Sequence, residues 1–222
     1  MPNWCSSYLM ISGDARSIAK IKMKVDAMKK NVRDENYEIV ERGDLLFETL
    51  IGLGLAEAGL TRKEYDDEKW YDHNCSRFGT KWDIHDEYYE VLDDDDDPNM
   101  LTMSLTTAWS PPIPFAVQLS AKYGVYIRME SEEENYYVTQ IEKGEIISFN
   151  EYGYEEGTYQ VDPDHFWESV VPNTIENAFE EYDNIEDAVI SIKETFKFLP
   201  KKDMDIAMEE LKEYYKENQE AE

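Results

Sequence analysis

The order in which two hydrophobic periods alternate along residues 8–129 constrains the fold of this chain more than any other feature. Apolar residues spaced by three or four positions mark one face of a helix, whereas strict alternation marks a half-buried strand. The patterns predict strands at residues 8–11, 82–92, 101–107 and 125–129, and helices at residues 18–32 and 112–123. Strand, helix, strand, strand, helix, strand is the order of the split βαβ motif, so we expect an α+β, ferredoxin-like core.

The remaining segments predict additions to this core. Two apolar runs on either side of Gly144 predict a hairpin that extends the sheet. The other predicted elements are a short helix at 45–55, a loop at 61–77, and helices at 175–182, at 185–196 with Asn184 as its cap, and from 203 onward. We therefore expect a core over residues 1–130 with an insert at 43–80, and a hairpin plus acidic helical extension over 131–222, packed on the core.

Two short blocks combine a large aromatic ring with Gly or Pro and several hydrogen-bonding side chains. They are residues 78–83 (Phe-Gly-Thr-Lys-Trp-Asp) and residues 106–112 (Thr-Thr-Ala-Trp-Ser-Pro-Pro). Neither fits a plain amphipathic strand or helix. The mixture suits the ends of paired strands, where a ring packs while polar groups fix a turn. A structural role is one interpretation of both blocks, and ligand binding is the other.

Three blocks in this order resemble those of the YubB-type ferredoxin-like family, whose members come from phages, plasmids and prophages. The blocks are Asn3-Trp4-Cys5, Gly79-Thr80-Lys81-Trp82-Asp83 and Thr107-Ala108-Trp109-Ser110-Pro111-Pro112. The resemblance covers roughly residues 1–130. It implies a ferredoxin-like fold and a mobile-element origin, and it supplies no catalytic residues. Phe78 departs from the Trp that is common in the family, and the acidic insert after Val91 is unusual.

The net charge of −28 is distributed unevenly along the chain. Residues 1–42 carry eight basic and six acidic side chains, whereas residues 130–187 carry eighteen acidic side chains and one base, Lys143. Such a field repels nucleic acids and anionic membranes, because phosphate binding needs basic groups. We therefore expect neither nucleic acid nor a membrane as a direct partner, and we expect attraction to basic partners.

Cysteine content and hydropathy indicate the compartment. The two cysteines, Cys5 and Cys75, are too few for a disulfide framework and indicate a reducing environment. The N-terminus lacks the pattern of a signal peptide, and no apolar stretch reaches membrane-spanning length. We expect a cytoplasmic protein, located in the host cytoplasm if a phage encodes it.

Sequence motifs of catalysis are missing from the chain. It has no Gly-rich phosphate loop, no nucleophile elbow and no metalloprotease helix, so we expect no enzyme. His73, Cys75 and His85 with Asp86 lack the spacing of a metal site, and we expect no metal and no cofactor. The acidic run at 93–97 lacks the spaced ligands of a calcium loop and is expected to be a solvated turn.

The acidity suggests a first function. We expect a protein that binds a basic, nucleic-acid-binding host protein, as a counter-defence inhibitor or DNA mimic; an acidic surface that only aids solubility is the alternative. Homo-oligomers remain an open alternative. The acidic residues expected to contact the partner are Glu130, Glu132, Glu133, Glu134, Glu155, Glu156, Glu180, Glu181 and Asp183.

The aromatic blocks suggest a second function. A pocket with clustered rings and one cation would bind a small ligand or a nucleotide. Lys81, Trp82, Asp83 and Trp109 are the expected ligand-binding residues.

Overall fold

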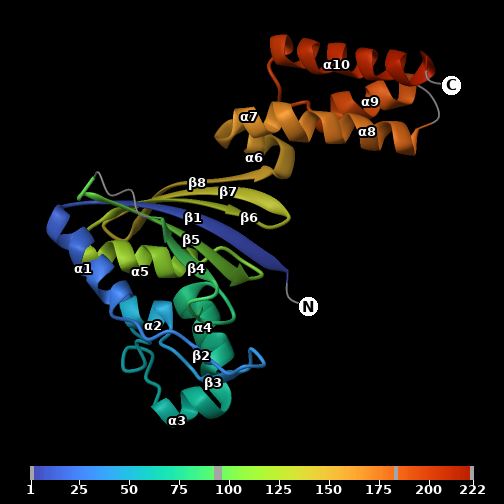
Figure 1. Ribbon diagram of the computed structural model, residues 1–222. Coiled ribbons are helices and arrows are strands. Elements are labelled where there is room, and N and C mark those ends of the chain that lie inside the picture. Colours follow the sequence, from blue (N-terminus) through green and yellow to red (C-terminus); the bar gives the residue numbers. More distant parts are fainter. Residues whose placement is uncertain (1–2, 93–96, 183–184, 221–222) are drawn as a thin grey trace. The chain divides into compact units, whose positions relative to one another are not determined.

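The computed structural model describes residues 3–92, 97–182 and 185–220 (Figure 1). The chain forms two compact units. The first comprises Met1–Glu133 and Tyr137–Asn150, and the second comprises Glu134–Tyr136 and Glu151–Glu222. The predicted hairpin thus belongs mostly to the first unit.

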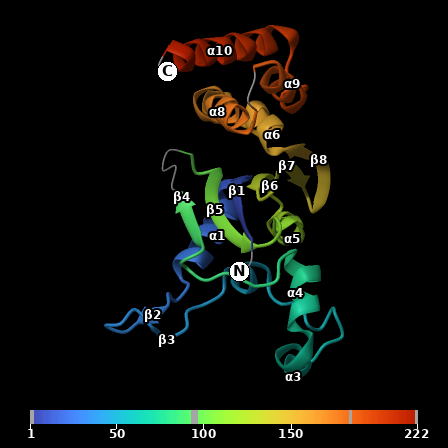
Figure 2. The ribbon, with the colours of Figure 1, turned by 90° about the vertical axis from the view of Figure 1, so that its right-hand side faces the viewer.

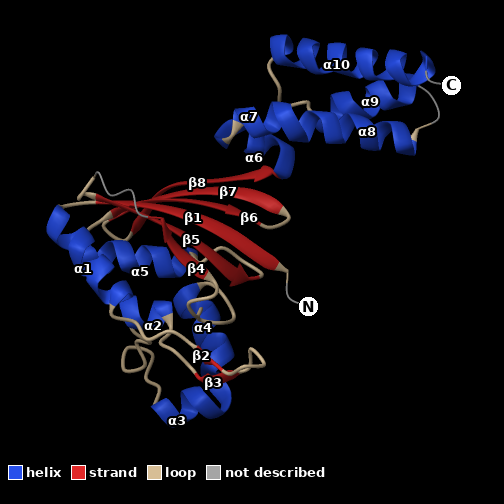
Figure 3. Cartoon of the chain, viewed as in Figure 1, coloured by secondary structure: helices blue, strands red, loops and turns tan. Residues whose placement is uncertain are grey.

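The first unit is built on a sheet that, within the described residues, has six strands in the order β4-β5-β1-β6-β7-β8 (Figure 3). The central strand β1 pairs antiparallel with β5 on one side and with β6 on the other. The strands are β1 (Trp4–Ser12), β4 (Tyr89–Leu92), β5 (Met100–Ala108), β6 (Tyr126–Glu132), β7 (Asn135–Glu142) and β8 (Glu145–Gly153). The predicted α+β, ferredoxin-like core is confirmed, and β7 and β8 extend its sheet as expected.

The turn between β7 and β8 explains their pairing. Lys143 and Gly144 both have positive φ angles, 52° and 81°. This combination is that of a type I′ turn, whose twist matches the twist of the two strands.

Two helices, α1 (Ala15–Asp26) and α5 (Ile113–Tyr123), lie against one face of the sheet (Figure 1). Asp14 caps α1 by accepting hydrogen bonds from the backbone N–H groups of Arg16 and Ser17. Gly124 ends α5 with a φ of 68°. Alternate residues of β1, such as Leu9 and Ile11, are fully buried in the core beneath these helices.

The insert between α1 and β4 departs from the sequence prediction. The helix predicted to reach Val32 ends at Asp26, and the loop predicted at 61–77 is helical, because Thr61 and Glu64 form a capping box. The strand predicted from Trp82 begins only at Tyr89. The insert contains β2 (Val32–Arg33), β3 (Ile39–Glu41), α2 (Leu46–Ile51), α3 (Arg62–Glu64), the π-helical turn η1 (Tyr65–Lys69) and α4 (Trp70–Phe78). Figure 2 labels β2, β3, α3 and α4.

The second unit is helical and has a hydrophobic core of its own. Phe166, Ile192 and Phe196 are fully buried at its centre. Its helices are α6 (Tyr154–Val161), α7 (Pro163–His165), the π-helical turn η2 (Phe166–Val170), α8 (Val171–Glu181), α9 (Ile185–Thr195) and α10 (Lys201–Glu220). The last three were predicted and the others were not; the predicted cap Asn184 lies outside the described residues. Among the described helices, each is too short or too polar to cross a membrane.

Candidate functional site

The three blocks that carry the family resemblance meet at one end of the sheet. Trp4 on β1 pairs with Ala108 on β5, and the backbone N–H of Trp109 donates to the carbonyl of Asn3 at 2.9 Å. The loop after α4 joins them, because Thr80 Oγ1 donates to the carbonyl of Ala108 at 3.0 Å. We call residues 3–5, 79–83 and 107–112 the motif cluster.

Ser110 and Gly79 hold two of these blocks close together. Ser110 Oγ donates to the carbonyl of Gly79 at 2.6 Å. Gly79 has a φ of 83°, and a Cβ atom there would lie 2.4 Å from Cδ of Pro114. Only glycine fits both this backbone conformation and this close approach.

Trp109 has an unusual backbone conformation. Its φ is 72°, although positive φ is rare for a bulky residue and costs on the order of 1–3 kcal/mol. Its ring does not gain burial in return, since 48% of the residue is exposed. The hydrogen bond from Thr107 Oγ1 to the carbonyl of Ser110, at 2.8 Å, helps to hold this turn. Strained and exposed aromatic residues of this kind are typical of binding sites.

Lys81 lies among three aromatic rings. Its Nζ is 4.3 Å from the ring centroid of Trp82, 5.2 Å from that of Trp109 and 6.0 Å from that of Tyr71. The ammonium group is therefore held by cation–π attraction. In the strand expected here, Lys81 and Asp83 would both lie on the face opposite to the Trp82 ring, but this segment is a loop. Its shape is set by hydrogen bonds, such as that from Asn74 Nδ2 to the carbonyl of Lys81 at 3.1 Å.

A pocket of about 510 Å³ opens beside Trp82. Trp4 and Tyr88, whose rings stack at 5.2 Å, contribute a second aromatic wall. The volume falls within the range of about 300–1,000 Å³ that is common for small-molecule sites. The lining residues are Trp4, Arg42, Leu45, Tyr65, Asn74, Trp82, Asp83, Ile84, His85, Tyr88 and Ala108.

Asp83 anchors the loop beneath this pocket. Its carboxyl group accepts hydrogen bonds from the backbone N–H groups of Phe47 at 2.8 Å, Glu48 at 2.7 Å and Ile84 at 2.8 Å. The first two belong to the first turn of α2, so Asp83 caps that helix from a distant part of the chain. Burial raises the pKa of Asp83 to about 7, although the three N–H donors favour the charged form.

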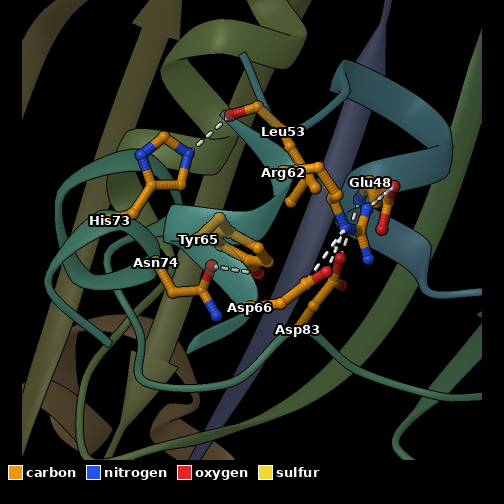
Figure 4. A network of polar contacts seen from close by, with 8 residues as sticks. All are labelled: Glu48, Leu53, Arg62, Tyr65, Asp66, His73, Asn74 and Asp83. Carbon is orange, nitrogen blue, oxygen red and sulfur yellow. Dashed lines mark hydrogen bonds and ion pairs between the residues drawn. The ribbon is translucent and has the colours of Figure 1, made fainter. Parts of the chain in front are cut away.

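A polar network surrounds Asp83 (Figure 4). Tyr65 Oη donates to Asn74 Oδ1 at 2.9 Å. Arg62 binds Asp66 at 3.0 Å and Glu48 at 3.4 Å. The carboxylates of Asp66 and Glu48 are therefore already paired with Arg62.

The histidines differ in their surroundings. His73 Nε2 lies 2.6 Å from the carbonyl of Leu53, so this ring is committed to a structural contact (Figure 4). His85 lines the pocket, and its buried Nδ1 has no hydrogen-bond partner among the described residues. Across residues 3–92, 97–182 and 185–220, no group of three or more His, Cys, Asp or Glu residues is arranged to hold a metal ion.

Cys5 is part of the buried side of the motif cluster. It is fully buried, and burial raises the pKa of its thiol to about 11. Ser7 Oγ lies 3.9 Å from its Sγ and 2.9 Å from Ser131 Oγ. The thiol is therefore protonated at neutral pH and has a structural position.

The acidic residues predicted to contact a partner are divided between the two units. Glu130 is paired with Arg128 at 2.7 Å, and Glu133 accepts a hydrogen bond from Asn3 at 3.0 Å. Glu132 on β6 and Glu181 at the end of α8 are exposed. Glu134 lies between β6 and β7, Glu155 and Glu156 lie half-buried in the first turn of α6, and both Asp183 and the side chain of Glu180 lie outside the described residues. The acidic partner site stays a prediction.

Of the four residues expected to bind a ligand, Trp82 and Asp83 line the pocket, whereas Lys81 and Trp109 lie beside it, with the Lys81 ammonium between the two indole rings. Ligand binding by these residues stays a prediction. Sequence reasoning missed Arg42, Tyr65 and Tyr88 as pocket residues and treated His85 only as a weak metal candidate. Trp4 belongs to the first block of the family resemblance, and that block was the sequence signal that could have placed Trp4 in the pocket.

Comparison with known proteins agrees with the fold. A ferredoxin-like domain of Api92-like proteins matches residues 85–166. The crystal structure of the protein Api92 from Yersinia pseudotuberculosis is similar at 10% sequence identity with a TM-score of 0.45, covering 69% of this chain and 99% of that chain. No curated protein matches the chain. The expected YubB-type name and the mobile-element origin stay predictions.

Proposed function

We propose that this chain is a non-enzymatic binding module whose pocket at the motif cluster takes a small planar ligand. One observation carries the proposal: Trp4 and Trp82, from two blocks far apart in the sequence, and Tyr88 place exposed aromatic rings around a single pocket. Trp4 is 46% exposed and Trp82 38% exposed, and both line the pocket. Flat aromatic walls bind planar groups by stacking.

A purely structural role accounts for only part of the motif cluster. The hydrogen bonds of Thr80, Thr107 and Ser110 and the close approach at Gly79 hold the blocks together. None of these contacts uses an indole ring. Large rings that remain half-exposed contribute little to the core, so ligand binding gives them a role that packing does not.

Replacing Trp82 by Leu is the direct test of this function. We expect planar compounds to raise the melting temperature of the native protein and to lose affinity for Trp82→Leu about 5- to 150-fold, which is a stacking contribution of about 1–3 kcal/mol. The measurement is a thermal-shift titration with nucleosides, nucleotides, flavins and aromatic amino acids, with aliphatic acids as the comparison class.

The matched control is Phe149→Thr. Phe149 is an exposed aromatic residue on β8, at the opposite edge of the sheet from β4, and it does not line the pocket. It should leave every affinity unchanged. Planar compounds that bind Trp82→Leu as tightly as the native protein would refute the assignment.

Partner binding through acidic residues is retained as a separate proposal. The charge of residues 130–187 and the exposure of Glu132 and Glu181 support it. In this proposal the protein comes from a phage or plasmid and acts in the host cytoplasm as a counter-defence inhibitor or DNA mimic of a basic host protein. The pocket offers no support for it, because two cations, Arg42 and Lys81, lie at or beside the pocket.

A further inference from the structure

Asp83, which lines the pocket, and its sequence neighbours Asp86 and Glu87 are engaged by groups of the same chain. Asp83 accepts three backbone N–H groups. Asp86 accepts the backbone N–H of Asn31 at 3.2 Å, and Glu87 forms an ion pair with Arg33. Asp83, the one of these three that lines the pocket, has both oxygens engaged and therefore little capacity left to bind a cationic ligand.

By contrast, two cations at or beside the pocket are not engaged by carboxylates of the described chain. Arg42 lines the pocket, and the ammonium of Lys81 lies on the ring of Trp82, which also lines it. In the part of the chain that the structure describes, neither side chain forms a hydrogen bond or an ion pair, and the ammonium is held only by aromatic rings. The local electrostatics thus favour an anion, although the whole chain carries −28.

His85 is a further polar residue beside these groups. Its buried Nδ1 lacks a partner among the described residues, and the residue lines the pocket. An unsatisfied buried polar atom costs free energy unless a ligand or water completes it. Because this atom is closed to solvent, a ligand in the pocket does not reach it, and the class of ligand follows from the rings and the cations.

We propose that the planar ligand is a nucleoside monophosphate, with its base stacked on Trp82 and its phosphate bound by Arg42 and Lys81. This assignment rests on the proposed function and adds the class of ligand to it. Arginine suits phosphate because its planar guanidinium donates two parallel hydrogen bonds.

A free nucleotide fits this site better than a nucleic acid. A polymer would bring many phosphates near a strongly acidic chain, and only two local cations are available to neutralise them. A mononucleotide brings one phosphate, which Arg42 and Lys81 can match.

The test is a titration followed by tryptophan fluorescence. The probes are AMP, GMP, CMP and UMP, the four corresponding nucleosides, inorganic phosphate, and a single strand of ten deoxynucleotides. The variants are Arg42→Gln, Lys81→Gln and, as a charge-matched control, Lys63→Gln, which removes an exposed lysine that does not line the pocket.

We expect at least one monophosphate to bind about ten-fold more tightly than its nucleoside, the size typical of a charge-assisted hydrogen bond. Because the two cations share this gain, Arg42→Gln and Lys81→Gln should each weaken the monophosphate about three-fold and leave the nucleoside unchanged. Lys63→Gln should bind as the native protein does. Phosphate alone and the single strand should bind more weakly than the monophosphate.

Three results would overturn the inference and separate it from the proposed function. Equal affinity for nucleoside and monophosphate would show that Arg42 and Lys81 do not bind a phosphate, and it would still agree with a pocket for planar ligands. Tighter binding of the single strand than of the monophosphate would show that the ligand is a nucleic acid and not a free nucleotide. Binding of another planar class that depends on Trp82, with no nucleotide binding at all, would refute the nucleotide and keep the pocket.

Discussion

Asp83→Ala is expected to lower the free energy of unfolding by about 3 kcal/mol, since it leaves three backbone N–H groups without an acceptor. Two of these donors, on Phe47 and Glu48, begin α2, which supplies Phe47 to the core. Phe47 is fully buried, with its ring centroid 4.2 Å from that of Phe115, so loss of the cap also loosens aromatic packing. Urea denaturation measures the effect as a lower midpoint at an unchanged slope.

The control for this variant is Asp66→Ala. Asp66 is another carboxylate of the same network, but its contact with Arg62 is solvent-exposed (Figure 4). Exposed ion pairs contribute about 0–1 kcal/mol, so Asp66→Ala should have little effect. Equal destabilisation by the two substitutions would show that Asp83 does not cap α2.

Asp83 also gives the stability a dependence on pH. Its pKa is about 7 in the folded protein, against 3.8 for an unperturbed aspartate. The folded protein therefore holds a proton that the unfolded chain releases between these values. The contribution of the protonated Asp83 to the stability is fully present below about pH 4 and is lost as the pH rises through 7. The stability difference between the native protein and Asp83→Asn should fall across this range, and a difference that is constant or rises would contradict the raised pKa.

Gly79→Ala is expected to destabilise the protein by about 3 kcal/mol, through a left-handed backbone cost and an overpacking cost. The first cost arises because an alanine at position 79 would have a φ of 83°. The second arises because its Cβ would lie 2.4 Å from Cδ of Pro114. Thermal and urea unfolding should show the same ranking of variants.

Gly59→Ala separates the two costs. Gly59 has a similar φ of 67°, but a Cβ there would meet nothing within 4 Å. It should cost about 1 kcal/mol, from the backbone alone. If Gly79→Ala cost no more than Gly59→Ala, the two motif blocks would not be closely packed.

Hydrophobic periodicity was sufficient to predict the core of the fold. The helix that ends at Gly124 and the hairpin that turns at Gly144 have strong local signals, because glycine with positive φ ends one and turns the other. The insert was harder. Trp82 looked like the start of an alternating strand, but Asp83 accepts hydrogen bonds from α2, and that tertiary contact determines the loop.

The candidate site was predictable only in part, for a related reason. Lys81, Trp82 and Trp109 are visible because their blocks combine rings with turn-forming residues. Arg42 and His85 belong to neither block and reach the pocket through the folding of the insert. No local pattern in the sequence reveals that convergence.

The indole N–H signals of the five tryptophans, followed by NMR during titration with planar fragments, show whether this pocket binds planar ligands. Trp4 and Trp82 line the pocket, whereas Trp70 and Trp167 do not. We expect planar fragments to shift the signals of Trp4 and Trp82 and to leave those of Trp70 and Trp167 in place. Fragments that shift Trp70 or Trp167 instead, or that leave Trp4 and Trp82 unchanged throughout, would contradict this expectation.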